Sequence, residues 1–170
     1  MGDVDDRLVA WLRERAPTAR RVVPVCTGAW LLAAAGLLDG RRATTHWAGL
    51  DQLAEVGVTP SKERVVIDGH HATAAGVSAG IDMALTLAGL IAGDDIAQEV
   101  QLIIEYALEP PHDAGSVDSA PAAVVESVRD GAVGLTSTQC PIGRTGETAA
   151  RGEPRTSASA NPCPSSGAVR

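Results

Sequence analysis

A valine-rich run meets an apolar segment around residue 26, and this junction constrains the fold more than any other feature of the chain. Residues 21–25 are mostly valine, which predicts a short buried strand. Residues 28–38 are apolar on nearly every side, which predicts a buried helix. A buried strand followed directly by a helix is typical of α/β proteins with a mostly parallel sheet.

The remaining segments continue this alternation of helices and strands. Helices are predicted over 4–16, 47–56, 80–92, 94–106 and 121–129, and strands over 43–46, 64–67 and 71–74. The turn Asp68-Gly69-His70 joins the last two strands as a hairpin. Because the chain has three Trp, one Tyr and no Phe, its core must be built from Ala, Val, Leu and Ile.

The composition changes after Leu135, where Thr, Ser, Gly, Pro and Arg dominate and periodicity ends. We therefore predict one domain over 1–135 and a low-complexity, disordered tail over 136–170. The tail holds Cys140 and Cys163, with no His at metal-ligand spacing, so no zinc site is expected there. With Cys26 the cysteines number three, and an odd number favours a reducing, cytoplasmic compartment over a disulfide framework.

Charge and hydropathy exclude two classes of partner. The net charge of −7 argues against nucleic acid, because phosphate binding requires a basic surface. The longest apolar run, 81–93, contains Asp82 and is too short to cross a bilayer. No basic segment precedes an apolar stretch at the start, so no signal peptide is expected. We therefore expect neither a nucleic acid nor a membrane as partner.

Cys26 occupies the junction between the predicted strand and helix, which is the layout of a nucleophile elbow. A sharp turn there exposes the thiol at the carboxyl edge of the sheet, and a helix N-terminus favours the thiolate. The backbone N–H groups of Thr27 and Gly28 would face a developing negative charge. An inert buried cysteine at a strand end is the alternative.

Three groups of segments resemble the ThiJ/PfpI superfamily. They are Val25-Cys26-Thr27-Gly28-Ala29 with residues 34–47, residues 65–69 with 73–82, and residues 101–106 with 110–116. The last group is most similar to the isonitrile hydratase branch, and the resemblance covers about residues 4–133. It implies a class I glutamine amidotransferase-like, flavodoxin-like fold, which is a three-layer α/β sandwich.

The resemblance also implies a lyase reaction. Cys26 would be the nucleophile that attacks the terminal carbon of an isonitrile, and water would then release an N-substituted formamide. Thr27 would supply a hydrogen bond near the intermediate, and His46, twenty residues after Cys26, is a candidate neighbour of the thiol. No metal or organic cofactor is implied, and the chain is expected to form a homodimer.

Two features depart from the family pattern. Strands that precede the first helix in the family have no counterpart here, nor do their acidic residue facing the cysteine and their Gly-Gly loop. We therefore expect a domain truncated at its N-terminus, with an open sheet edge. Pro24 is the second departure, because a proline in a central strand removes a ladder hydrogen bond.

Several residues also have ordinary structural explanations. His46 would pack at a strand end and bond a backbone carbonyl, and His70 and His71 would form a solvated pair at a turn. Asp82 would serve the dipole or cap of its helix, while Glu105 and Tyr106 would end the next one.

Two further functions remain open. One is a sensor domain related to AraC-type transcription regulators, which share the Cys-Thr-Gly and Thr-Thr-His-Trp motifs. The other is an inactive fragment, which would bind a hydrophobic dye and unfold without cooperativity.

Overall fold

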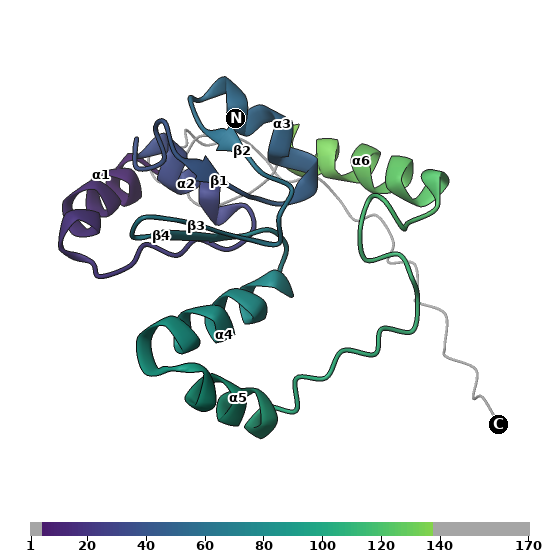
Figure 1. The fold of residues 1–170 in the computed structure, drawn as a ribbon. Helices are drawn as coiled ribbons and strands as arrows, with labels where there is room; N and C mark the ends of the chain where they lie inside the picture. Colours follow the sequence, from purple (N-terminus) through teal and green to yellow (C-terminus); the bar gives the residue numbers. More distant parts are fainter. Residues whose placement is uncertain (1–4, 138–170) are drawn as a thin grey trace, which may run out of the picture. The chain divides into compact units, whose positions relative to one another are not determined.

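The computed structural model describes residues 5–137, along which helices and strands alternate (Figure 1). The elements are α1 (Asp6–Arg15), η1 (Ala16–Thr18), α2 (Gly28–Ala34), β1 (Arg42–Ala43), η2 (Trp47–Gly49), α3 (Leu50–Glu55), β2 (Thr59–Pro60), β3 (Val65–Asp68), β4 (His71–Ala74), α4 (Ala79–Ala92), α5 (Asp94–Ile103) and α6 (Ala122–Ser137). The predicted tail, 136–170, lies outside the described residues except for its first two, which belong to α6.

Residues 22–26 run parallel to β4. Four backbone hydrogen bonds join the two segments: Val22 N–H to His70 C=O (3.0 Å), Ala72 N–H to Val22 C=O (3.1 Å), Ala74 N–H to Pro24 C=O (3.1 Å) and Cys26 N–H to Ala74 C=O (2.9 Å). These bonds place Cys26 at the carboxyl end of the pairing, and only Thr27 separates it from α2. Within the described residues, no strand pairs with the other edge of 22–26.

Pro24 explains why this segment is not a continuous strand. The pairing consists of two isolated bridges, Val22 with His71 and Val25 with Ala74, and both keep the same register. The bond missing between them is the one that an N–H at residue 24 would donate, and proline has none. The predicted strand over 21–25 therefore pairs as expected at its two ends and is interrupted in its middle.

The ladders are shorter and more mixed than the mostly parallel sheet that the sequence predicts. β1 pairs with β2 in parallel over two residues, and β2 was not predicted. β3 and β4 form the expected antiparallel hairpin, with Val65 opposite Ala74 and Asp68 opposite His71.

Most predicted helices are present with shifted ends. The helix predicted over 28–38 ends at Ala34, before Gly36 with its φ of 69°. The helix predicted over 94–106 ends at Ile103, because Glu105 adopts a left-handed backbone with φ of 50°. The last helix continues to Ser137 rather than ending at residue 129.

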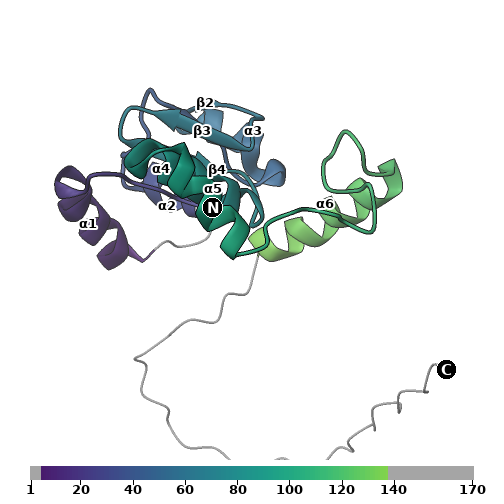
Figure 2. The same cartoon turned by 60° about the horizontal axis from the view of Figure 1, so that its bottom comes forward.

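The core is divided between the two sides of the β3–β4 hairpin, with α2 on one side and α4 on the other (Figure 1, Figure 2). On the first side, Leu32, Leu38 and Leu53 pack together. On the second, Ala72 and Ala74 of β4 contact Ala79 and Met83 of α4. The small alanines of β4 let α4 approach closely, which positions its N-terminus beside the Cys26 turn: a Cβ added at Gly80 would lie 3.1 Å from Val25.

Asp82 links three segments of the chain. Its carboxylate accepts a hydrogen bond from Arg64 Nε, just before β3 (2.7 Å), and another from the hydroxyl of Tyr106, beyond α5 (2.7 Å). Burial by itself would raise the pKa of Asp82, but the hydrogen bonds from Tyr106 and Arg64 outweigh it and hold that pKa below its usual value. Asp82 is therefore a junction between elements, in addition to lying in the first turn of α4 as predicted.

His71 is buried, with 3% of its surface exposed, and neither ring nitrogen has a hydrogen-bond partner. Its ring lies 4.0 Å from that of His70. Burial, followed by the charges of His70 and Arg41, lowers the pKa of His71 from 6.5 to about 4, although Asp68 acts in the opposite direction. The prediction of a solvated pair is wrong for His71, because the hairpin turns this side chain into the interior.

None of the helices within residues 5–137 has the length and apolar character needed to cross a lipid bilayer.

Acidification should destabilise the fold through His71. As the pH falls from 6.5 to about 4, the unfolded chain binds a proton at this residue before the folded chain does, so the free energy of unfolding decreases. One pKa unit corresponds to about 1.4 kcal/mol, so the loss across this window reaches a few kcal/mol. Urea unfolding of wild type and His71→Leu at both ends of the window measures it. The His71→Leu variant should lose this pH dependence, whereas His70→Gln should reduce it only in part, because burial contributes more to the lowered pKa than the charge of His70 does. Equal slopes in wild type and His71→Leu would contradict the prediction.

The ionisation of Tyr106 should report the contact with Asp82. The hydrogen bond to Asp82, together with burial and the carboxylate charge, raises the pKa of Tyr106 above 10.0. Tyr106 is the single tyrosine of the chain, so the ultraviolet absorbance of tyrosinate measures it alone. Asp82→Asn should lower this pKa toward 10.0. Asp95→Asn removes a carboxylate from the first turn of α5 and should leave the pKa of Tyr106 unchanged. If Asp82→Asn also leaves the pKa of Tyr106 unchanged, the contact is refuted.

Candidate functional site

Cys26 forms a sharp turn between the paired segment 22–26 and α2. Its backbone is left-handed, with φ of 56°, which is uncommon for a residue other than glycine and costs about 1–3 kcal/mol. The turn is held from two sides, because the Cys26 N–H donates to Ala74 C=O and the Cys26 C=O accepts from the Thr45 hydroxyl at 2.8 Å. The cysteine is partly exposed, so its thiol lies neither deep in the core nor on an open surface.

The two residues after Cys26 differ in what their backbones offer. The Gly28 N–H donates to Val25 C=O (2.9 Å) and closes the turn, so this amide is already engaged. Thr27 is exposed and precedes α2 as its cap residue, without a side-chain capping bond. Of the two amides that the sequence suggests as donors to a developing charge, Thr27 is the one that the turn leaves available.

Two buried threonines connect the Cys26 turn to the neighbouring segment. Thr44 and Thr45 are each 1% exposed. The Thr44 N–H donates to the hydroxyl of Thr73 (2.9 Å), and the Thr45 hydroxyl donates to Cys26 C=O. No role for these two threonines was predicted from the sequence. The sequence feature that could have indicated such a role is the pair of adjacent hydroxyl residues directly before His46, because hydroxyls that become buried need hydrogen-bond partners.

His46 follows Thr45 and caps the short helix η2. Its Nδ1 accepts a hydrogen bond from the Ala48 N–H (3.3 Å), so the bond is to a backbone amide and not to the carbonyl anticipated from the sequence. In the neutral ring this places the proton on Nε2. The ring packs on that of Trp47, with centroids 5.4 Å apart.

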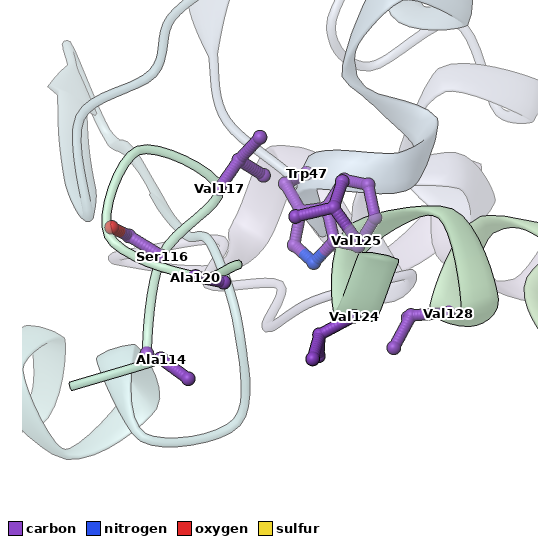
Figure 3. A pocket seen from close by; sticks show the side chains of 9 residues that line it. Trp47, Ala114, Ser116, Val117, Ala120, Val124, Val125 and Val128 are labelled. Atoms are coloured by element: carbon purple, nitrogen blue, oxygen red, sulfur yellow. The ribbon is translucent and has the colours of Figure 1, made fainter. Parts of the chain in front are cut away.

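A hollow that is open to solvent lies over Trp47 (Figure 3). Its other walls are the segment 114–120 and one face of α6. The side chains of Val117 and Val125 point toward the Trp47 ring, and the guanidinium of Arg129 lies 5.6 Å from the ring centroid. This hollow was not predicted from the sequence. In the sequence, the valines at 124, 125 and 128 indicate an apolar helix face. Only the folded chain shows that this face lies opposite Trp47.

Among residues 5–137, His, Cys, Asp and Glu side chains form no group of three that would hold a metal ion. The candidate residues are Cys26 with Thr27, the connecting Thr45, and His46 with Trp47. A hydrogen bond joins Thr45 to Cys26, whereas His46 bonds the backbone of Ala48. Such an arrangement offers a thiol nucleophile, a backbone amide and hydroxyl beside it, and an imidazole one residue beyond the threonine that binds the cysteine carbonyl.

Comparison with known proteins identifies relatives of this chain. The DJ-1/PfpI family matches residues 3–89. An isonitrile hydratase of Pseudomonas putida is 54% identical over 125 residues, which are 74% of this chain and 55% of that enzyme. The HTH-type transcriptional regulator CdhR of Pseudomonas aeruginosa is 39% identical over 99 residues, which are 57% of this chain and 30% of the regulator.

A solved structure supports the fold as well. The crystal structure of a ThiJ/PfpI family protein from Pseudomonas syringae has a TM-score of 0.73 and 38% sequence identity to this chain. The match covers 77% of this chain and 54% of that one. This chain thus spans about half the length of the hydratase and of the solved structure, and about a third of the regulator. The flavodoxin-like α/β fold is shown by these likenesses, and the chain belongs to the DJ-1/PfpI family.

Proposed function

We propose that this chain carries out the cysteine-dependent hydration of an isonitrile to an N-substituted formamide. The observation that carries the proposal is the Cys26 turn. Cys26 has a left-handed backbone, and its N–H and C=O are both hydrogen-bonded to other segments. The position of the thiol therefore does not depend on α2 alone. The likeness to an isonitrile hydratase, at 54% identity, supports this substrate class.

The reaction balances with water as the only co-reactant. The Cys26 thiolate forms a bond to the terminal carbon of the isonitrile, and that carbon takes a proton, which gives a thioimidate on the enzyme. Water then adds to the same carbon, the C–S bond breaks, and the thiolate leaves. The product is the formamide, and the thiol is restored.

Thr27 and His46 serve this reaction as supporting residues. The Thr27 N–H and hydroxyl lie next to the attacking sulfur along the chain and would donate hydrogen bonds to the nitrogen of the intermediate. The proton that the isonitrile carbon takes up balances the one that the Cys26 thiol releases. His46 binds the backbone through Nδ1, so its Nε2–H would donate a hydrogen bond to the substrate. No metal or organic cofactor enters these steps.

The proposal extends to compartment and assembly. A free thiol at Cys26 must stay reduced, which favours the cytoplasm. Leu102 and Ile103 of α5 are 78% and 79% exposed, and Leu90 and Ile91 of α4 lie open as well. Exposed apolar side chains of this kind support a homodimer.

A second candidate function is a sensor domain that binds a small molecule without converting it. The likeness to an HTH-type transcriptional regulator, which is 39% identical over 99 residues, favours it. If the chain is a sensor domain, an isonitrile should raise its melting temperature and be recovered unchanged. If the chain is a hydratase, the formamide should accumulate.

Replacing the nucleophile should abolish turnover. We expect Cys26→Ser to lower kcat for cyclohexyl isonitrile by at least about a hundredfold, because a hydroxyl is a far weaker nucleophile than a thiolate. Chromatographic measurement of N-cyclohexylformamide gives the rate. Acid-quenched wild-type protein should gain the mass of one isonitrile, and the variant should gain none. Cys163→Ser is the matched control and should retain both turnover and adduct; undiminished turnover in Cys26→Ser would refute the proposal.

A further inference from the structure

We infer that Thr45 is a positioning residue whose hydroxyl orients and strengthens the Thr27 N–H as a hydrogen-bond donor, acting through the peptide group between Cys26 and Thr27. This inference rests on the proposed function, because it explains what prepares the amide that the intermediate would bind. Thr45 lies 19 residues after Cys26, so the contact comes from a separate segment of the chain.

The carbonyl that Thr45 binds and the N–H of Thr27 belong to one peptide group. A peptide group is planar, and in its trans form the C=O and the N–H point in opposite directions. The described residues contain no cis peptide bond, so this geometry applies between Cys26 and Thr27. The Thr45 hydroxyl lies 2.8 Å from the Cys26 carbonyl oxygen. By holding that oxygen, Thr45 also fixes the direction in which the Thr27 N–H points.

Burial makes this contact hard to replace. Thr45 is 1% exposed, so water has little access to its hydroxyl. Its segment is held on β4, because the Thr44 N–H donates to the Thr73 hydroxyl at 2.9 Å. The Cys26 carbonyl accepts one other bond, from the Ala29 N–H in the first turn of α2, and that bond is longer at 3.3 Å. Thr45 therefore supplies the shorter of the two bonds and the only one that comes from outside the turn and α2.

The same bond increases the strength of the Thr27 donor. A hydrogen bond to a carbonyl oxygen polarises the whole peptide group, and hydrogen bonds linked in this way strengthen one another. The Gly28 N–H is already bonded to the Val25 carbonyl, which leaves the Thr27 N–H as the available amide. A donor that is oriented before the reaction stabilises a developing charge without reorganisation.

The strained backbone of Cys26 is the reason that this peptide group needs a hold. A φ of 56° is unfavourable for a residue with a Cβ, and relaxation of Cys26 would rotate the peptide group that follows it. The net stabilisation from one hydrogen bond is of the same order as this strain. Thr45 therefore shifts the balance toward the conformation that keeps the Thr27 N–H in place.

The test replaces the Thr45 hydroxyl with a methyl group. Thr45→Val keeps the shape of the side chain and removes the hydrogen bond, whereas Thr45→Ser keeps the bond. Thr44→Val makes the same exchange at the adjacent residue, which is also 1% exposed, and is the matched control because Thr44 bonds β4 through its backbone N–H. Each variant is assayed with cyclohexyl isonitrile after its melting temperature has been compared with that of wild type. If Thr45→Val does not fold, Thr45→Ala removes the same hydroxyl.

We expect Thr45→Val to lower kcat about tenfold and to leave KM within about twofold, because the Thr27 donor acts on the chemical step rather than on substrate binding. Thr45→Ser, which keeps the hydroxyl on a freer side chain, should recover kcat to within about threefold of wild type. Thr44→Val should match wild type. An unchanged kcat in Thr45→Val, or an equal loss in Thr44→Val, would overturn the inference while leaving hydration intact.

A measurement without turnover separates this inference from the proposed function. The amide resonance of Thr27 is followed by heteronuclear NMR in isotope-labelled protein. It should shift in Thr45→Val, return toward its wild-type position in Thr45→Ser, and move much less in Thr44→Val. This pattern supports the inference even if no isonitrile is hydrated, and in that case hydration alone fails. A Thr27 resonance that Thr45→Val leaves unchanged would overturn the inference even if hydration is observed.

Discussion

The parallel pairing between residues 22–26 and β4 is the interaction on which the rest of the structure depends. It is short, since Pro24 removes its central donor, and yet both bridges keep one register. Through β4 the pairing reaches the hairpin with β3 on one edge and, across the alanines of β4, the packing of α4. Every element that approaches Cys26 is therefore positioned relative to one four-bond ladder.

The candidate site combines parts that lie far apart in the sequence. The turn supplies the thiol, and the threonine pair at 44–45 connects it to β4. This connection is favourable because burying a hydroxyl costs free energy unless the hydroxyl is hydrogen-bonded. The Thr45 hydroxyl donates to the Cys26 carbonyl, and the Thr73 hydroxyl accepts from the Thr44 N–H. A buried polar contact thus orients the turn while the cores on either side remain aliphatic.

Features set by local sequence were predictable, whereas those set by contacts between distant residues were not. Helical periodicity predicted α1, α4 and α5, and Asp68-Gly69-His70 predicted the hairpin. Pro24 was recognised as a break in a strand, and the structure shows which bond it removes. The burial of His71 and the hollow over Trp47 escaped prediction, because each depends on which surface the folded chain brings against that side chain. The roles of Cys26, Thr27 and His46 in catalysis remain predictions.

The left-handed backbone at Cys26 means that keeping the thiol lowers the stability of the fold. Glycine adopts this conformation without steric cost, whereas any residue with a Cβ is strained there. A chain under selection for folding alone would thus gain from glycine at position 26 and would drift toward it. Keeping a cysteine there carries a standing energetic penalty, which makes this position a sensitive marker of whether a descendant of this sequence still uses its sulfur.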